Sequence, residues 1–361
     1  MKNLTILGLD IGGANTKAAL VQFSNSKILD SIHYVEYFPF WEKKLNEIPK
    51  IFKNIISIFK NKNFSLKNID YIAITITAEL SDAFQTKREG ILTILTALGK
   101  VFEKEKMFFI SNSGKFLDYI AAKSEFSNIA AANWMSTSLF LGQFISQGIL
   151  IDAGSTTIDI IPIVNSVPVA KGKDDISRML NHELIYTGGL RATIPSITQF
   201  VPYKEKLVRI SFEKFALISD VHRILNNISE IEYINDTADN RSKSIEDCYA
   251  RLARIICMDF ETITKDELDE IAYYIYKKQI EIVSDEIQKF ITELIKRVPL
   301  FERNLSFVIT GISANFLAKK SLKKLGYDNI QDYEKITNIP DQISSSAFAV
   351  AGALYFQLKD N

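Results

Sequence analysis

The stretch LGLDIGGANTKAA, residues Leu7–Ala19, carries the pattern that decides the fold class of this chain. An apolar run that ends in a carboxylate, Asp10, and then in glycines predicts a buried strand that turns into a tight loop. Because glycine has no Cβ, the N–H groups of such a loop can approach a phosphate closely, and the carboxylate suits the Mg²⁺ that phosphates bring. The candidate ligand-binding residues of this first loop are Gly12, Gly13, Asn15, Thr16 and Lys17, with Asp10 as the candidate metal ligand.

The pattern occurs a second time at Leu150–Pro162, LIDAGSTTIDIIP, where Asp152 follows another apolar run. One Asp-x-Gly after a strand is equally typical of an ordinary β-turn, so neither loop alone indicates a ligand. Two such loops at comparable places in the two halves of one chain favour a duplicated phosphate site. The second loop offers Asp152 as a candidate metal ligand and Gly154, Ser155, Thr156 and Thr157 as candidate ligand-binding residues.

The composition indicates an ordinary globular protein with two domains. The chain has 361 residues, of which 47% are hydrophobic and 24% charged, and this length is sufficient for two cores. Lys plus Arg and Asp plus Glu number 43 each, which argues against a nucleic-acid or membrane partner held by bulk charge. The chain has only two cysteines, no run of about 18 apolar residues and an N-terminus that turns acidic too soon for a signal peptide. We therefore predict a cytoplasmic location.

A third motif lies near the C-terminus, where Phe307–Ala314, FVITGISA, runs from an apolar strand into Gly311. Three separated motifs in this order resemble the actin-like ATPase and sugar kinase superfamily. The resemblance implies an α/β fold of two ribonuclease-H-like domains with a ligand cleft between them, and a turn at Gly311 that packs on a nucleoside. It implies a first domain at residues 1–147, a second domain with a helical insertion at 148–343, and a C-terminal helix, 344–361, that packs back on the first domain.

The pattern that follows the first loop agrees with such a domain. Residues 17–23 and 27–37 predict two strands, residues 41–60 an amphipathic helix, and residues 70–77 a further buried strand. Three strands, a helix and a strand are the start that the superfamily resemblance implies. Further along, residues 127–145 and 266–298 predict helices.

Ionisable and hydroxyl side chains are concentrated in Thr77–Gly90, TAELSDAFQTKREG, directly after the strand at 70–77. Ligands of open α/β sheets bind at the carboxyl ends of strands, so this stretch is a candidate wall of the site. The alternative is a solvated helix N-terminus. The candidate catalytic residues of this stretch are Glu79, Asp82, Lys87 and Arg88.

Four residues elsewhere are candidates for substrate binding. Asn133 follows three alanines on the predicted helix, and Arg191 follows the Gly188-Gly189 turn, which suits an anion. Asp239 and Arg241 lie in a polar segment before another helix, and long polar insertions are usually functional or disordered.

Five signatures together resemble one branch of the superfamily: DIGGANTK, TAELSDAFQTKREG, AANWMSTS, LIDAGSTTIDIIP and TADNRSKSIEDCYARLARIICMD. It comprises hydantoinase/oxoprolinase-related proteins that are often described as tetrahydromethanopterin-linked C1-transfer pathway proteins. This chain departs from the branch pattern at Ala78, where a glycine is expected, and at Met135, where a histidine is expected.

This resemblance implies a role in the methanofuran biosynthesis of methanogens. Members join (5-(aminomethyl)furan-3-yl)methyl diphosphate to γ-glutamyltyramine, form an ether and release diphosphate. The resemblance then implies that Asp10 and Asp152 serve Mg²⁺, that loop N–H groups and Lys17 hold the diphosphate with Lys87 or Arg88, and that Glu79 or Asp82 is the general base. The implied partners are these two small molecules.

Two other classes of function remain open from the residues alone. The same loops and the Gly311 turn would serve an ATP-dependent small-molecule kinase or an oxoprolinase-like amidohydrolase, with ATP as the cofactor. A non-enzymatic actin-like filament or nucleotide sensor would also keep the loops, but it has no need for the charges of Thr77–Gly90.

Overall fold

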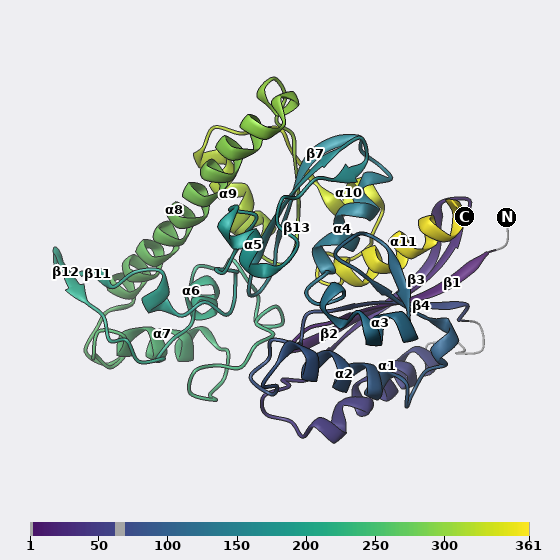
Figure 1. Ribbon diagram of the computed structural model, residues 1–361. Helices are drawn as coiled ribbons and strands as arrows, with labels where there is room; N and C mark the ends of the chain where they lie inside the picture. The colour runs from purple at the N-terminus through teal and green to yellow at the C-terminus, as the bar shows by residue number, and fades with distance from the viewer. Residues whose placement is uncertain (1–2, 62–68, 361) are drawn as a thin grey trace. The chain divides into compact units, whose positions relative to one another are not determined.

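The computed structural model describes residues 3–61 and 69–360, which form two compact units (Figure 1). One unit comprises Met1–Gly148, Ile161–Arg178 and Asp332–Asn361, and the other comprises Ile149–Ile160 and Met179–Gln331. We call them the first and the second unit. The predicted α/β class is confirmed. Each large sheet contains parallel and antiparallel strand pairs, and helices occur between its strands along the chain.

The first sheet has the strand order β3-β2-β1-β4-β5-β6. Its strands β1 to β3 form an antiparallel meander, while β1 pairs in parallel with β4 and β4 with β5. The strand β6 closes the edge by pairing antiparallel with β5. The strands are β1 (Leu4–Ile11), β2 (Asn15–Ser24), β3 (Lys27–Tyr37), β4 (Tyr71–Ile76), β5 (Met107–Ile110) and β6 (Phe116–Asp118).

The second sheet repeats this order. Its path is β10-β8-β7-β13-β14, so its strands, numbered along the chain, also lie in the order third, second, first, fourth, fifth. This shared order is the ribonuclease-H-like topology that the sequence predicts for both halves. The strands are β7 (Gln147–Ala153), β8 (Ile158–Val164), β10 (Leu184–Ile185), β13 (Phe307–Thr310) and β14 (Ile330–Asp332), with β9 (Val167–Pro168) paired to β8 outside the path.

Helices of the first unit pack on its sheet, and α1 (Ile48–Asn61) buries one apolar face. The predicted helix at 41–60 begins later than expected, after the short 3-10 turn η1 (Leu45–Glu47). Pro49 explains this start, because proline lacks an N–H group and is tolerated only in the first helical turn. The other helices are α2 (Lys87–Leu98), η3 (Lys104–Lys106), α3 (Tyr119–Ser124), η4 (Phe126–Asn128), α4 (Asn133–Gly142), α10 (Tyr333–Thr337) and α11 (Ser345–Asp360).

The predicted helix at 127–145 is interrupted before α4. Ala131 adopts a positive φ of 48°, and its N–H donates to the carbonyl of Ile76 at 3.0 Å. Ala130 also forms an isolated parallel bridge with Ile76. Because these residues bond to the end of β4, they cannot form helical hydrogen bonds, and α4 begins only at Asn133.

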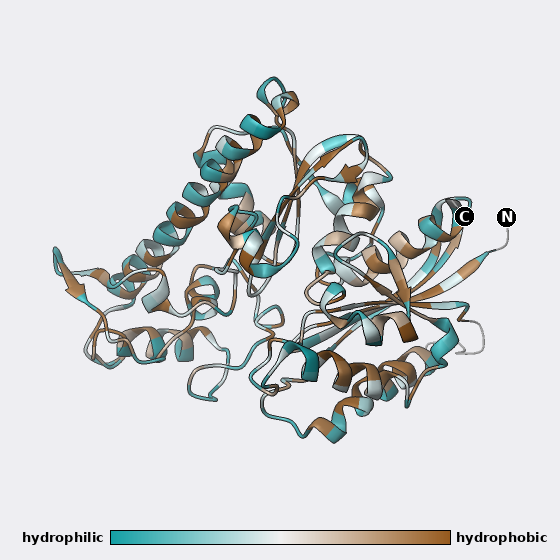
Figure 2. Ribbon diagram, viewed as in Figure 1, coloured by the Kyte–Doolittle hydropathy of each residue, from teal (hydrophilic) through white to brown (hydrophobic). Residues whose placement is uncertain are grey.

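The second unit is organised along α8 (Lys265–Arg297), close to the predicted 266–298. Its first turn is capped by Thr264 and Glu267 in a reciprocal capping box. Figure 2 shows hydrophilic and hydrophobic residues along the length of this helix, and Ile271, Ile275 and Val283 are among its buried side chains. The other elements are η5 (Ile194–Ser196), β11 (Phe200–Tyr203), β12 (Lys206–Arg209), α6 (Ile218–Ile224), α7 (Ile245–Arg254), η6 (Pro299–Glu302), the π-helix η7 (Ala314–Ala318) and α9 (Lys319–Lys324). The residues of α5 (Asp175–Leu180) belong in part to the first unit and in part to the second.

The C-terminal helix α11 lies on the sheet of the first unit, where it packs on β1, β2, β4 and α4. Gly8 permits this contact: a Cβ at this position would lie 2.0 Å from the carbonyl oxygen of Ala347. The backbone of α11 in its first turn therefore packs directly against the backbone of β1. This brings the start of α11 to the strand that contains Asp10.

Candidate active site

The first loop joins β1 to β2 by a tight turn. Gly12 donates its N–H to the carbonyl of Asn15 at 3.0 Å, and a Cβ on Gly12 would lie only 2.9 Å from that oxygen. The next two N–H groups, of Gly13 and Ala14, have no protein acceptor within the described part of the chain. The N–H groups that this loop can offer to an anion are therefore those of Gly13 and Ala14 rather than that of Gly12.

The second loop, between β7 and β8, repeats the same turn. Gly154 donates its N–H to the carbonyl of Thr157 at 2.9 Å, which matches the bond from Gly12 to Asn15 in atoms and in spacing. In each loop the aspartate stands two residues before the glycine. The N–H groups of Ser155 and Thr156, like those of Gly13 and Ala14, have no protein acceptor among the described residues.

Asp10 is buried at the end of β1, and its two carboxylate oxygens differ. Oδ2 accepts the hydroxyl of Ser346 at 2.5 Å and lies 3.6 Å from Nζ of Lys17. Oδ1 is buried and has no hydrogen-bond partner among the residues that the structure describes. Burying a carboxylate oxygen without a partner is costly, so Oδ1 fits a role as ligand to a cation.

No group of three or more His, Cys, Asp and Glu side chains among the described residues could hold a metal ion alone. Mg²⁺ takes one or two protein carboxylates together with water and phosphate oxygens. Asp10 supplies one such carboxylate in the first unit, and Asp152 is the second-last residue of β7 in the second unit.

The turn that contains Gly188 and Gly189 holds the second loop. The N–H groups of Gly188, Gly189 and Arg191 donate to the carbonyls of Thr156, Gly154 and Ser155 at 2.9 to 3.0 Å. A Cβ on Gly188 would lie 2.6 Å from the backbone of Ser155, so only glycine permits this approach. The sequence predicts that this turn binds an anion. In the structure its N–H groups donate instead to carbonyl oxygens of the second loop.

The third motif supports the second loop from β13. Gly311 has a φ of +92°, and a Cβ there would lie 2.7 Å from Oδ1 of Asp152. Ser313 donates from its N–H and its hydroxyl to the carbonyl of Ala153, both at 2.9 Å. Sequence reasoning missed Ser313, although it lies two residues after the predicted Gly311.

A buried chain of side chains holds the Gly188 turn in place. Nε2 of Gln279 donates to the carbonyl of Gly188 at 3.0 Å and to the hydroxyl of Thr187 at 3.1 Å. Its Oε1 must then accept from Nε2 of His222, at 3.0 Å, while Nδ1 of His222 faces the amide of Asn227 at 3.1 Å. Burial lowers the pKa of His222 to about 4. The neutral imidazole therefore acts as a fixed link, which gives His222 a structural role.

In the stretch Thr77–Gly90 the structure separates Glu79 from its neighbours. Glu79 follows β4, is 1% exposed, and both of its carboxylate oxygens lack a partner among the described residues. Burial raises the pKa of Glu79 to about 7; the nearby backbone N–H groups and the charge of Lys87 oppose this shift, and Asp175 adds to it. Lys87 itself pairs with Asp175 at 3.2 Å. Glu79 is thus a carboxylate near its midpoint at neutral pH, as a general base requires.

The other residues of this stretch are more exposed. Asp82 lies in an exposed turn, and Arg88 is exposed with its guanidinium 5.5 Å from the ring of Phe126. Thr86 caps α2 by accepting the N–H of Glu89. Of the four candidate catalytic residues, Glu79 is therefore buried and Lys87 is half-buried and ion-paired, whereas Asp82 and Arg88 are exposed.

Asn133 is the first residue of α4, and its carbonyl accepts the hydroxyls of Ser136 and Thr137. The next residue, Trp134, is buried beneath the guanidinium of Arg178, which lies 4.3 Å from the ring. Arg178 is 1% exposed and lies one turn after Asp175 on α5. Sequence reasoning did not single out either residue of α5, because their contacts with α2 and α4 are long-range.

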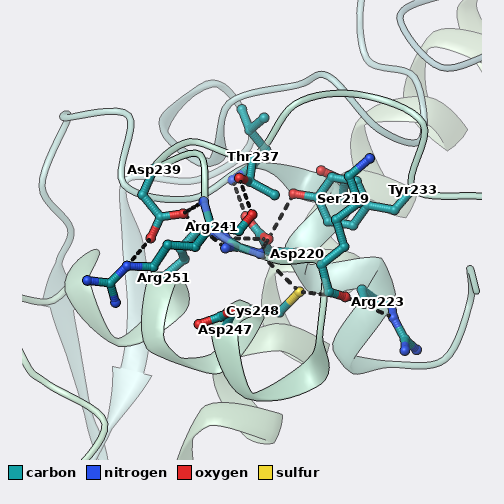
Figure 3. Close-up of polar contacts among 12 residues, drawn as sticks. Ser219, Asp220, Arg223, Tyr233, Thr237, Asp239, Arg241, Asp247, Cys248 and Arg251 are labelled. Carbon is teal, nitrogen blue, oxygen red and sulfur yellow. Dashed lines mark hydrogen bonds and ion pairs between the residues drawn. The ribbon is translucent and has the colours of Figure 1, made fainter. Parts of the chain in front are cut away.

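Asp239 takes part in a buried ion-pair network of the second unit (Figure 3). Arg251 donates to Asp220 at 2.8 Å and to Asp239 at 3.0 Å, and Arg254 donates to Asp239 at 2.9 Å. Asp220 also accepts the hydroxyl of Tyr233 at 2.9 Å. Arg241 lies beside this network with an exposed side chain.

Asp220 and Arg251 are completely buried, and each charge is compensated within the network. We therefore assign Asp239 a role in holding the polar segment on α6 and α7. The two cysteines lie nearby in the chain: Cys248 is buried beside Arg251, and Cys257 is exposed. Burial raises the pKa of the Cys248 thiol to about 12.

Two sheets of the same strand order, each with an Asp-x-Gly turn after its first strand, define the actin-like class of fold. A nucleotide-free structure of acetone carboxylase is similar, with a TM-score of 0.55 over 97% of this chain and 70% of that chain, at 10% identity. Within the described residues, no helix is long and apolar enough to cross a membrane.

The chain belongs to the hydantoinase/oxoprolinase family, whose model matches residues 70–357. It is 36% identical over 357 residues to the (4-{4-[2-(gamma-L-glutamylamino)ethyl]phenoxymethyl}furan-2-yl)methanamine synthase of Methanocaldococcus jannaschii, covering 98% of this chain and 99% of the relative. It is 32% identical over 193 residues to the synthase of the same name from Methanococcus vannielii, covering 52% of this chain and 82% of that relative. The family resemblance found in the sequence motifs is confirmed.

Burial of Glu79 makes a prediction about stability. The folded protein keeps a proton on Glu79 up to a pKa of about 7, whereas the unfolded chain releases it near 4.5, so the free energy of unfolding falls as pH rises between these values. Glu79→Gln cannot ionise and escapes this loss. The variant should therefore gain about 2–3 kcal/mol over wild type on going from pH 4.5 to pH 8, measured by urea unfolding.

Asp82→Asn is the matched control, since Asp82 is an exposed carboxylate of the same stretch. It removes a carboxylate from the same stretch without touching the desolvated one, so it should not show the gain expected of Glu79→Gln. If the difference in the free energy of unfolding between Glu79→Gln and wild type stays constant from pH 4.5 to pH 8, Glu79 is not held in a desolvated site.

Proposed function

We propose that this protein forms an aryl ether in methanofuran biosynthesis. It transfers the (5-(aminomethyl)furan-3-yl)methyl group from its diphosphate to the phenol oxygen of γ-glutamyltyramine and releases diphosphate. The observation that carries the proposal is the 36% identity, over 98% of this chain, with a synthase whose name describes a phenoxymethyl-furan product. The phenoxymethyl group in that name is the ether that this reaction makes.

The reaction exchanges one carbon–oxygen bond for another. The bond between the furanylmethyl carbon and the bridging diphosphate oxygen breaks, and diphosphate leaves with the electron pair. The phenol oxygen forms the new bond to that carbon and gives up its proton. An electron-rich furan stabilises positive charge on the adjacent carbon, so the protein has two tasks: to stabilise the departing diphosphate and to accept the phenolic proton.

The two loops suit the first task. In the first unit we assign the N–H groups of Gly13 and Ala14 to diphosphate oxygens, because these donors have no protein acceptor among the described residues. Ser155 and Thr156 offer the equivalent N–H groups in the second unit. Lys17 adds a positive charge beside the first loop. Asp10 would be a ligand of Mg²⁺ in the first unit, and Asp152 is the equivalent carboxylate of the second unit. Mg²⁺, when bound, would neutralise charge on the leaving diphosphate.

Glu79 suits the second task better than Asp82. Its carboxylate is buried, both oxygens lack partners among the described residues, and its pKa of about 7 leaves it partly ionised at neutral pH. Asp82 is exposed to solvent. We assign Glu79 as the base that takes the phenolic proton. Lys87 and Asp175, which pair with each other, shift its pKa in opposite directions. Asn133 and Arg191 remain proposed contacts for the acceptor.

The direct test of this function is incubation of the protein with Mg²⁺, the furanyl diphosphate and γ-glutamyltyramine, without ATP. Mass spectrometry should detect the ether and one equivalent of diphosphate. A requirement for ATP, with release of ADP for each turnover, would instead identify an ATP-dependent family member and would contradict the proposal.

The assignment of the base predicts a difference between two variants of one stretch. Glu79→Gln should lower the rate of ether formation about 10²–10⁴-fold, the usual cost of losing a general base. Asp82→Asn should keep the rate within about threefold of wild type. The wild-type rate should rise with pH as Glu79 ionises near its pKa of about 7.

Equal losses in Glu79→Gln and Asp82→Asn would contradict the assignment. So would a rate for Glu79→Gln close to that of wild type, provided that melting curves show both variants folded.

A further inference from the structure

Ser346, in the first turn of α11, contacts the candidate metal ligand of the first loop across 336 residues of chain. Its hydroxyl donates to Oδ2 of Asp10 at 2.5 Å. We propose that Ser346 is a positioning residue that holds the Asp10 carboxylate so that Oδ1 faces the magnesium diphosphate. This inference rests on the proposed function, which assigns Asp10 to Mg²⁺.

The placement of Ser346 is built into the packing of the first unit. Gly8 lies two residues before Asp10 on β1, so both residues face the same side of the sheet. Because Gly8 has no side chain, the backbone of Ala347 lies directly over it. The neighbouring residue of α11, Ser346, then reaches Asp10, and it is 2% exposed.

The two oxygens of Asp10 are thereby given different tasks. Oδ2 is held by the hydroxyl of Ser346, with Lys17 3.6 Å away, while Oδ1 is buried without a partner among the described residues. Thr75 stands beside Asp10 in the register of β1 and β4, and its buried hydroxyl also lacks a partner in the described chain. Unmet polar groups of two neighbouring strands point to a ligand on this side of Asp10.

A hydroxyl suits this position better than a second cation. Nζ of Lys17 lies 3.4 Å from Oγ of Ser346 and 3.6 Å from Asp10, so in the ligand-free protein it neutralises the carboxylate. When diphosphate binds, its stronger negative charge attracts Lys17. Ser346 then remains as the donor that keeps Oδ2 in place, and because it is neutral it leaves the full charge of Asp10 for the cation.

The test measures binding of Mg²⁺ in the presence of inorganic diphosphate, the product of the proposed reaction. The melting temperature of the full chain is followed as Mg²⁺ is added at a saturating concentration of diphosphate. Ser346→Ala removes the donor and should raise the half-saturating Mg²⁺ concentration about tenfold or more, the effect of losing a hydrogen bond to a charged group. Ser346→Thr keeps the hydroxyl and should stay within about threefold of wild type.

Ser138→Ala is the matched control. Ser138 is a buried serine of α4, a helix that packs on α11, and its hydroxyl donates to the carbonyl of Met135 at 3.0 Å. This variant should leave the Mg²⁺ dependence unchanged. Ser346→Cys, which keeps the volume but offers only a weak donor, serves as the test variant if Ser346→Ala does not fold, and it should also raise the half-saturating concentration.

The inference is overturned if the foldable variant among Ser346→Ala and Ser346→Cys binds within threefold of wild type. It is overturned equally if Ser138→Ala shows the same loss, or if magnesium diphosphate does not raise the melting temperature of wild type. The ether assay on wild type tests the reaction separately. Impaired binding in Ser346→Ala together with no ether from wild type would leave the role of Ser346 intact and refute the proposed reaction.

Discussion

Both candidate loops depend on the same hydrogen bond: a glycine N–H donates to the carbonyl three residues later, at the Asp-x-Gly that follows a buried run. Gly12 bonds to Asn15 and Gly154 to Thr157 in this way. The bond closes the turn, so that the next two N–H groups are left without a protein acceptor in the described chain, beside an aspartate. Donors and carboxylate side by side are what a metal-bound diphosphate requires.

The two turns are supported by different means. Around the second turn, the Gly188 segment and Ser313 satisfy the loop carbonyls, and Gln279 and His222 fix that segment from within the core. Around the first turn, buried polar groups are left incomplete, namely Oδ1 of Asp10 and the hydroxyls of Thr16 and Thr75. The first unit also contains the desolvated Glu79. Desolvation of a carboxylate that is not ion-paired is typical of a site where chemistry occurs, and our account places the general base there.

Local pattern was sufficient for the class of fold and for both loops, because an apolar strand followed by Asp-x-Gly is encoded within ten residues. It could not decide between Glu79 and Asp82 as the base, because both are carboxylates of one stretch and only their burial in the fold distinguishes them. It missed Ser313, Ser346 and Asp175, whose partners lie far along the chain. It offered Asp239 as a substrate ligand but did not show its ion pairs with Arg251 and Arg254. The break before α4 depends on a bond to Ile76 that no local pattern shows.

In the proposed reaction diphosphate is a leaving group from carbon, whereas the related kinase chemistry would cleave a bond to phosphorus. Labelling the phenol oxygen of γ-glutamyltyramine with ¹⁸O distinguishes the two most directly. Our account predicts that the label is retained in the ether and that the released diphosphate carries none. A product in which the labelled oxygen is bonded to phosphorus, with no labelled ether, would contradict it.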